Sequence, residues 1–131
     1  MKPFSFDPCV LLFNIAQNER CAKIEMYLKR QGIRFLHVPP EDFGRQLGSL
    51  LSLPGFEARA SAAVLPFSEE ILVMSGFDQR LLQSFLNFFS SEGIKRVALK
   101  AMLTPTNASW TAAELHRNLR AEHEQFQKLK K

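Results

Sequence analysis

Two short runs of purely apolar residues, separated by 61 positions, stand out in the hydrophobic pattern of the chain. These runs, Val10–Phe13 and Ile71–Met74, are typical of strands that are buried on both faces. Two other runs, Arg34–Val38 and Lys95–Leu103, carry a histidine or a lysine among their apolar residues. Such mixing predicts strands at the edges of a sheet. The pattern therefore indicates four strands with the two apolar ones innermost.

Helices are predicted between the strands of each pair. Apolar residues recur at helical spacing from about Glu19 to Gln31, and again after Asp78, which is a good N-terminal cap. Gly32 and Gly93 then follow at positions where glycine commonly ends a helix. Each half of the chain thus reads as strand, helix, strand.

The two halves share one register. A shift of 61 positions aligns their apolar and glycine positions without a gap, bringing Val10 onto Ile71, Tyr27 onto Phe88 and Gly32 onto Gly93. Identity between the halves is low, so the repeat is one of pattern. We expect a single domain over residues 1–131, with pseudo-repeats over about 9–52 and 70–127.

This organisation predicts an α/β fold of the α+β sandwich kind. Two right-handed β-α-β units, interleaved with the apolar strands inside, would give the split β-α-β arrangement of ferredoxin-like folds, with extra helices. A parallel, doubly wound sheet is the alternative. It would bury all four strands and make the charge of Lys100 costly, so we favour the split arrangement.

The remaining segments are less regular. A short, glycine-interrupted helix is predicted over Phe43–Leu51, and Leu53–Phe67 reads as a long connection. A final helix begins at about Thr111, where Thr111 and Glu114 fit a capping box and Trp110 precedes the cap as a hydrophobic staple would.

The turn between the last strand and this final helix is the best candidate site. Its hydroxyls and amide lie next to a helix start, which suits an anion or a carbonyl-rich ligand, although tight turns prefer the same residue types. The Ser75–Asp78 turn would lie at the same end of the sheet, because strands three and four are expected to be parallel. The predicted ligand-binding residues are Lys100, Thr104, Thr106, Asn107, Trp110, Ser75 and Asp78.

Three functions are compatible with this pattern. The favoured one is a non-enzymatic ligand-binding or regulatory module that uses the Thr104–Trp110 turn to bind a small anionic ligand or a partner's backbone. The second is an enzyme acting on a phosphorylated or acyl metabolite, with Lys100 as the charge and His116 as the acid or base. The third is an interaction protein, for instance a homodimer, whose apolar stripe ending in Phe126 and Leu129 docks onto a partner.

Composition narrows the classes further. A net charge of +4 is spread along the chain, and 12 of the aromatic residues are Phe placed among aliphatics, so nucleic acid is not an expected partner. The first apolar run is too short for a signal peptide or a membrane span, which favours a cytoplasmic protein with no membrane association. With Cys9 and Cys21 as its two cysteines, the chain has too few for a disulfide framework, or for a zinc site without other ligands.

No catalytic residue, cofactor or metal site is assigned from the sequence. His116 and His123 are seven positions apart, whereas metal ligands on one helix are better spaced by three or four. His37 reads as an edge or core histidine, and Cys21 as a buried thiol in the apolar stripe of its helix.

Two stretches of the chain carry a resemblance. Val38–Gly48 (V-P-P-E-D-F-G-R-Q-L-G) and Leu99–Trp110 (L-K-A-M-L-T-P-T-N-A-S-W), with the following Thr111–His123, resemble an uncharacterised bacterial family of domains of unknown function. Its members share a strand, an L-K-A-x-L-T-P-x-N-x-x-W segment and a final helix. The resemblance implies a small cytoplasmic bacterial protein and brings no activity, substrate or cofactor.

Overall fold

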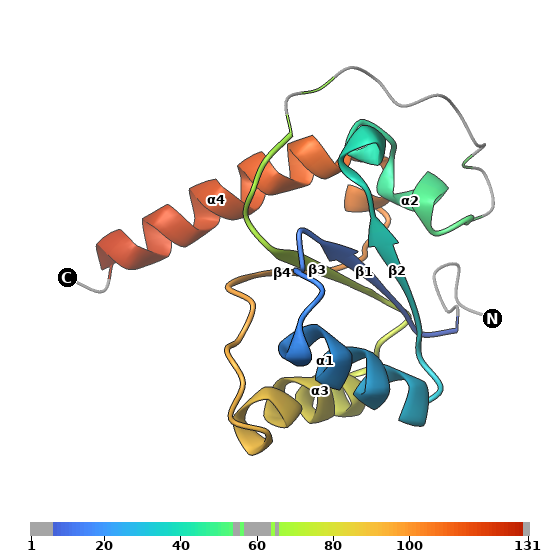
Figure 1. The fold of residues 1–131 in the computed structure, drawn as a ribbon. Coiled ribbons are helices and arrows are strands. Elements are labelled where there is room, and N and C mark those ends of the chain that lie inside the picture. Colours follow the sequence, from blue (N-terminus) through green and yellow to red (C-terminus); the bar gives the residue numbers. More distant parts are fainter. Residues whose placement is uncertain (1–6, 54–55, 57–63, 65, 130–131) are drawn as a thin grey trace.

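A four-stranded sheet lies between two layers of helices (Figure 1). The computed structural model describes residues 7–53, 56, 64 and 66–129, with the backbone alone over 125–129. The strands are β1 (Cys9–Phe13), β2 (Arg34–Val38), β3 (Ile71–Ser75) and β4 (Leu99–Met102), in the spatial order β2-β1-β3-β4. The α/β class and the number of strands agree with the sequence prediction.

The two apolar strands occupy the centre of the sheet, as predicted. β1 and β3 pair antiparallel, and each is flanked by a parallel partner, β2 beside β1 and β4 beside β3. Val10–Phe13 and every residue of β3 are buried, whereas β2 alternates between exposed and half-buried positions before the buried Val38. Burial on both faces is therefore what distinguishes the inner strands from the edges.

The ferredoxin-like interleaving is not found, and neither is the parallel alternative. The strands of each β-α-β unit are direct neighbours, so the units lie side by side instead of being split. The antiparallel β1–β3 pair excludes a fully parallel sheet. Both the split order and the observed one bury β1 and β3 and leave β2 and β4 at the edges. The hydrophobic pattern is the same for both and could not distinguish them.

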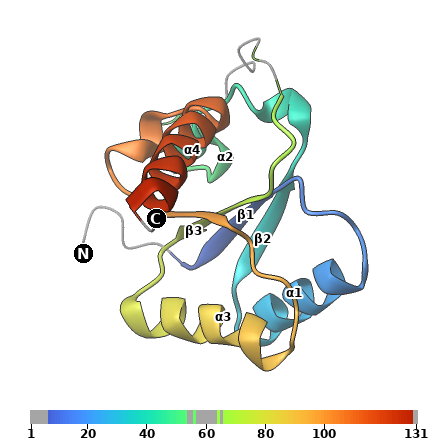
Figure 2. The same ribbon diagram turned by 90° about the vertical axis from the view of Figure 1, so that its left-hand side faces the viewer.

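Helices α1 (Glu19–Arg30) and α3 (Gln79–Ser91) cover one face of the sheet (Figure 2). Tyr27 of α1 stacks on Phe88 of α3 with ring centroids 4.4 Å apart. These two residues are the ones that the 61-residue shift aligns, so equivalent positions of the two units meet between the helices. Gly32 and Gly93 follow the two helices with positive φ values of 70° and 64°, as helix-ending glycines do.

The opposite face is covered by α2 (Leu47–Leu50) and α4 (Ala112–Leu129), with two single turns of 3-10 helix, η1 (Pro40–Asp42) and η2 (Asn107–Ser109). A separate hydrophobic cluster fills the space on each side of the sheet. Within the described part of the chain, no helix combines the length and apolar character that crossing a bilayer requires.

Two predicted elements are shorter than expected. The helix predicted over Phe43–Leu51 is reduced to α2, because Gln46 is held extended by an isolated bridge to Thr111. The strand predicted from Lys95 begins only at Leu99, which pairs with Ile71, the first residue of β3. Residues 95–98, all of them described, thus pair with no strand. Most of the connection predicted over Leu53–Phe67 lies outside the described residues.

Candidate functional site

The side chain of Asn107 stabilises the turn that follows β4. Its side chain Oδ1 accepts a hydrogen bond from the Thr104 amide at 2.8 Å, and its Nδ2 donates to the Met102 carbonyl at 3.0 Å. Its own amide donates to Thr104 Oγ1 at 3.1 Å. Asn107 is buried, and its side-chain amide is hydrogen-bonded to this turn through both its oxygen and its nitrogen, so it stabilises the backbone of the turn.

The rest of the Thr104–Trp110 turn contacts α2 and leads into α4. Thr106 is exposed, and Trp110 is half-buried against the cluster beneath α4. The Leu47 amide donates to the Trp110 carbonyl at 2.8 Å. The predicted capping box is confirmed, since the Thr111 amide bonds Glu114 Oε1 at 3.0 Å and the Glu114 amide bonds Thr111 Oγ1 at 3.1 Å.

The Ser75–Asp78 turn lies at the same end of the sheet, as the parallel pairing of β3 and β4 requires. The Leu103 amide donates to the Met74 carbonyl at 2.9 Å just where the two strands end. Ser75 is buried, and Asp78 accepts a hydrogen bond from the Leu81 amide at 2.8 Å as the cap of α3. The two turns are therefore close. The side chain of Asp78, like that of Asn107, accepts a hydrogen bond from a backbone amide three residues away.

Lys100 does not join these turns. It pairs with Leu72, and its side chain lies on the face that α1 and α3 cover, where Nζ donates to the Val97 carbonyl at 2.6 Å. The Trp110 turn packs on the opposite face, with the cluster that includes Leu115 of α4. The structure thus separates Lys100 from the Thr104–Trp110 turn.

The predicted pairing of Lys100 with His116 across a pocket is wrong. His116 belongs to α4, on the other face of the sheet, and its ring stacks on Phe67 with centroids 4.3 Å apart. Its Nε2 lies 2.9 Å from Glu69 Oε1. The enzyme hypothesis required these two side chains to face one another, so it loses its geometric basis.

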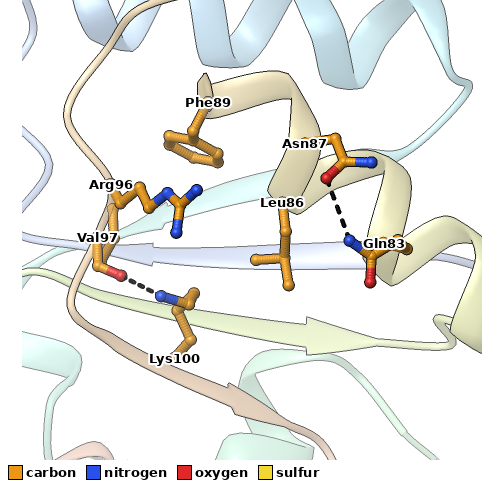
Figure 3. Close-up of a pocket in the computed structure, with 7 residues that line it drawn as sticks. All are labelled: Gln83, Leu86, Asn87, Phe89, Arg96, Val97 and Lys100. Carbon is orange, nitrogen blue, oxygen red and sulfur yellow. Dashed lines mark hydrogen bonds between the residues drawn. The ribbon is translucent and has the colours of Figure 1, made fainter. Parts of the chain in front are cut away.

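Lys100 instead borders a cavity of about 190 Å³ between α3 and β4 (Figure 3). Arg96 and Lys100 reach into it from one side, and an amide pair from α3, in which Gln83 Nε2 donates to Asn87 Oδ1 at 3.1 Å, lies on the other. The lining residues are Gln83, Leu86, Asn87, Phe89, Arg96, Val97 and Lys100. The cavity therefore has cationic, amide and apolar walls.

Two positively charged side chains, those of Arg96 and Lys100, line this cavity. Arg96 donates to Ser90 Oγ at 2.6 Å, and Lys100 donates to a carbonyl. In the described part of the chain, neither of them takes part in an ion pair. Burial lowers the pKa of Lys100 below 10.5, and the neighbouring Arg96 charge lowers it further. An anion placed between the two cations would relieve this repulsion.

Sequence reasoning selected Lys100 but missed its neighbours in the cavity. The signal that could have found Gln83 and Asn87 is their spacing of four on one helix, which places two amides side by side. The hydrophobic pattern predicts a strand at Arg96, whereas β4 begins only at Leu99 and Arg96 lies in the preceding segment beside the cavity.

A second group of polar side chains lies at the other edge of the sheet. Cys21 and Glu25 of α1 meet His37 of β2, with their ligating atoms all within 4.8 Å of one another. Of the described residues, these three are the ones placed to hold a metal ion together. The sequence signal was again a spacing of four on one helix, but nothing local indicated that His37 would lie against it.

Comparison with known proteins identifies one part of the chain. Residues 70–126 match the family model of a domain of unknown function (DUF3783). The predicted kind of family is thus confirmed for this stretch, which runs from β3 into α4 and contains every residue of the Lys100 cavity. The Val38–Gly48 stretch lies outside the match. No curated protein matches the chain, and no solved structure matches it.

Proposed function

We propose that the protein is a non-enzymatic binding module for a small anion, which it holds in the cavity between α3 and β4. The observation that carries this proposal is the pair of cations, Arg96 and Lys100, that line one cavity and have no carboxylate partner among the described residues. The proposal keeps the predicted anionic ligand and keeps Lys100 in its site. It gives the Thr104–Trp110 turn a structural role.

The electrostatics of the cavity favour an anion over a neutral ligand. Charge-assisted hydrogen bonds from a guanidinium or an ammonium to an oxyanion are roughly twice as strong as bonds between neutral groups. Lys100 is half-buried, so its charge is screened less than that of a fully exposed lysine. Gln83 and Asn87 add amide donors that can bind further oxygens of the same anion.

The size and walls of the cavity limit the ligand. Pockets for drug-sized molecules usually measure about 300–1,000 Å³, which is more than the 190 Å³ available. Leu86 and Phe89 form an apolar wall beside the cations. These features suit inorganic phosphate or a small phosphorylated or carboxylated metabolite, and they do not suit a whole nucleotide.

Thermal unfolding in the presence of inorganic phosphate tests this function. Phosphate should raise the melting temperature of the wild-type protein in a saturable way, because binding to the folded state alone stabilises it. Lys100→Met should remove this increase. Lys95→Met is the matched control: it removes the same charge one residue before Arg96, from an exposed side chain that does not line the cavity.

Two outcomes would contradict the proposal. One is an increase that Lys100→Met and Lys95→Met reduce equally, which would mean that only net charge matters. The other is no increase with phosphate, phosphorylated or carboxylated metabolites at millimolar concentrations.

A second function, self-association through α4, is supported by one observation. The C-terminal part of this helix extends beyond the sheet (Figure 1). The side chains of Phe126 and Leu129, on which the predicted dimer depends, lie outside the described residues. The homodimer therefore stays a prediction. The bacterial origin and the cytoplasmic location also stay predictions.

A further inference from the structure

A cysteine, a glutamate and a histidine converge at the edge of the sheet where α1 packs on β2. Glu25 Oε2 lies 2.6 Å from His37 Nε2 and 3.5 Å from Cys21 Sγ, and the same sulfur lies 3.9 Å from His37 Nε2. We infer that Cys21, Glu25 and His37 form a binding site for a divalent transition-metal ion of the zinc class.

The spacing of the three ligand atoms suits a tetrahedral ion. Zinc bonds of about 2.3 Å to sulfur and about 2.0–2.1 Å to nitrogen or oxygen place neighbouring ligand atoms roughly 3.3–3.6 Å apart. The two separations that involve Cys21 Sγ, 3.5 and 3.9 Å, are close to this range. The Glu25–His37 pair is closer, at a hydrogen-bonding distance, and would open slightly when the metal replaces the shared proton.

The arrangement does not suit a nucleophilic cysteine. A catalytic histidine uses one ring nitrogen for the thiol and the other for the carboxylate, whereas here Cys21 and Glu25 both approach Nε2. Burial, together with the Glu25 carboxylate, raises the pKa of Cys21 to about 11. The free thiol is thus protonated at neutral pH and unreactive.

Charge balance favours a divalent ion. A Cys21 thiolate and a Glu25 carboxylate supply two negative charges and His37 a neutral nitrogen, so the bound ion would be neutralised. Metal binding must then release the thiol proton to solvent. This ligand set, with sulfur, nitrogen and one carboxylate, is the mixture that zinc accepts and that calcium or magnesium does not.

The local structure presents the ligands and leaves an entry path. Cys21 and Glu25 are four residues apart on α1, so they share one helix face. Cys21 is buried, but 24% of the Glu25 side chain and 30% of the His37 side chain are exposed. Gln17, whose Oε1 lies 3.9 Å from Cys21 Sγ, is placed to offer this amide oxygen or to hold a water at the fourth position.

This site is independent of the proposed anion-binding function. All three ligands precede residue 70, outside the stretch that matches the family model. They also lie at the opposite edge of the sheet from the cavity beside Lys100.

Titration of the reduced protein with Co²⁺ and Zn²⁺ tests the inference. We expect one equivalent of Co²⁺ to produce the visible absorption of a tetrahedral site and a near-ultraviolet sulfur-to-cobalt band, and Zn²⁺ to displace it. Each metal ion bound at pH 7 should release at least one proton. His37→Gln and Glu25→Gln, which change half-exposed side chains, should each weaken binding by about tenfold or more.

The controls separate this site from other donors. Cys9→Ser removes the other thiol, and His116→Gln removes a histidine on the opposite face; both should bind Co²⁺ as the wild type does. Wild-type affinity in His37→Gln and Glu25→Gln, or no sulfur-to-cobalt band at millimolar Co²⁺, would overturn the inference. The phosphate-induced thermal shift should be unchanged in His37→Gln, so failure of either proposal can be recognised separately.

Discussion

His37 and Lys100 lie at opposite ends of a single row of residues that crosses the sheet. His37 pairs with Leu12, Leu12 with Leu72, and Leu72 with Lys100. The two leucines are fully buried in the cluster beneath α1 and α3, so the row is apolar in the middle and polar at both ends. Each polar end meets the helix of its own β-α-β unit.

The two ends of this row have different surroundings. At the first end, Glu25 and Cys21 of α1 reach His37 and fill the space. At the second end, α3 presents Leu86 and two amides, and a cavity remains beside Lys100. The same row of the sheet thus ends in a compact donor cluster at one edge and in an open cationic cavity at the other.

Lys100 makes the stability of the protein depend on pH. Its pKa is lowered in the folded state by burial and by Arg96, so between that value and 10.5 the unfolded chain holds more protons. Stability therefore increases with pH in this window. We expect Lys100→Met to be at least as stable as the wild type at pH 7, with a smaller advantage as the pH approaches 10.5. Urea unfolding of both proteins from pH 7 to 10 measures this difference, and a constant difference would contradict it.

Asn107 should matter for stability and not for binding. Asn107→Ala leaves the Thr104 amide and the Met102 carbonyl without the partners they have now, which should cost about 2–4 kcal/mol of unfolding free energy. Thr106→Ala, at an exposed position of the same turn, should change it by about 0.5 kcal/mol or less. If Asn107→Ala instead abolished the phosphate-induced shift at unchanged stability, the turn would be a binding site after all.

Glu69 should stabilise the fold at neutral pH and lose its effect in acid. A hydrogen bond from His116, with the nearby Arg120 charge, lowers the pKa of Glu69 below 4.5. The contribution is complete above that ordinary value and is lost as the pH falls through the lowered one. Glu69→Gln should therefore be less stable than the wild type at pH 6, and the difference in unfolding free energy should shrink as the pH falls below 4.5. A difference that stays constant as the pH falls from 6 into the acid range would point to a different cause.

The end of α4 tests the predicted dimer. A chain that stops after Glu124 lacks Phe126 and Leu129 and should be a monomer, whereas the full chain should have twice the monomer mass in solution at micromolar concentration. Light scattering coupled to size exclusion measures both. If the truncated and the full chain formed particles with the same number of chains, association through this segment would be excluded.

The sequence predicted most of the elements because each has a strong local signal. The runs Val10–Phe13 and Ile71–Met74 mark buried strands, and Asp78 caps α3 as expected. Pairing between elements has no such signal. Three features depend on contacts between distant parts of the chain. They are the choice of the edge strand beside β1, the bridge between Gln46 and Thr111, and the direction of the Lys100 side chain.

The candidate sites were harder to predict for the same reason. In the sequence, the hydroxyls and the amide around Asn107 could all bind a ligand. In the folded turn, the Asn107 side chain and the Thr104 hydroxyl accept hydrogen bonds from backbone amides of the turn itself. Cys21 and His37 each looked structural when taken alone, and only the packing of α1 on β2 brings them together. Whether the two units arose by duplication stays a prediction.

The central claim, that a small anion binds between α3 and β4, is tested most directly by nuclear magnetic resonance of the ¹⁵N-labelled protein titrated with inorganic phosphate. The account predicts saturable shifts of the amide signals of Arg96 and Lys100 and of the side-chain amides of Gln83 and Asn87, with the Thr104–Ser109 signals unchanged. Shifts confined to Thr104–Ser109, or none up to millimolar phosphate, would contradict it.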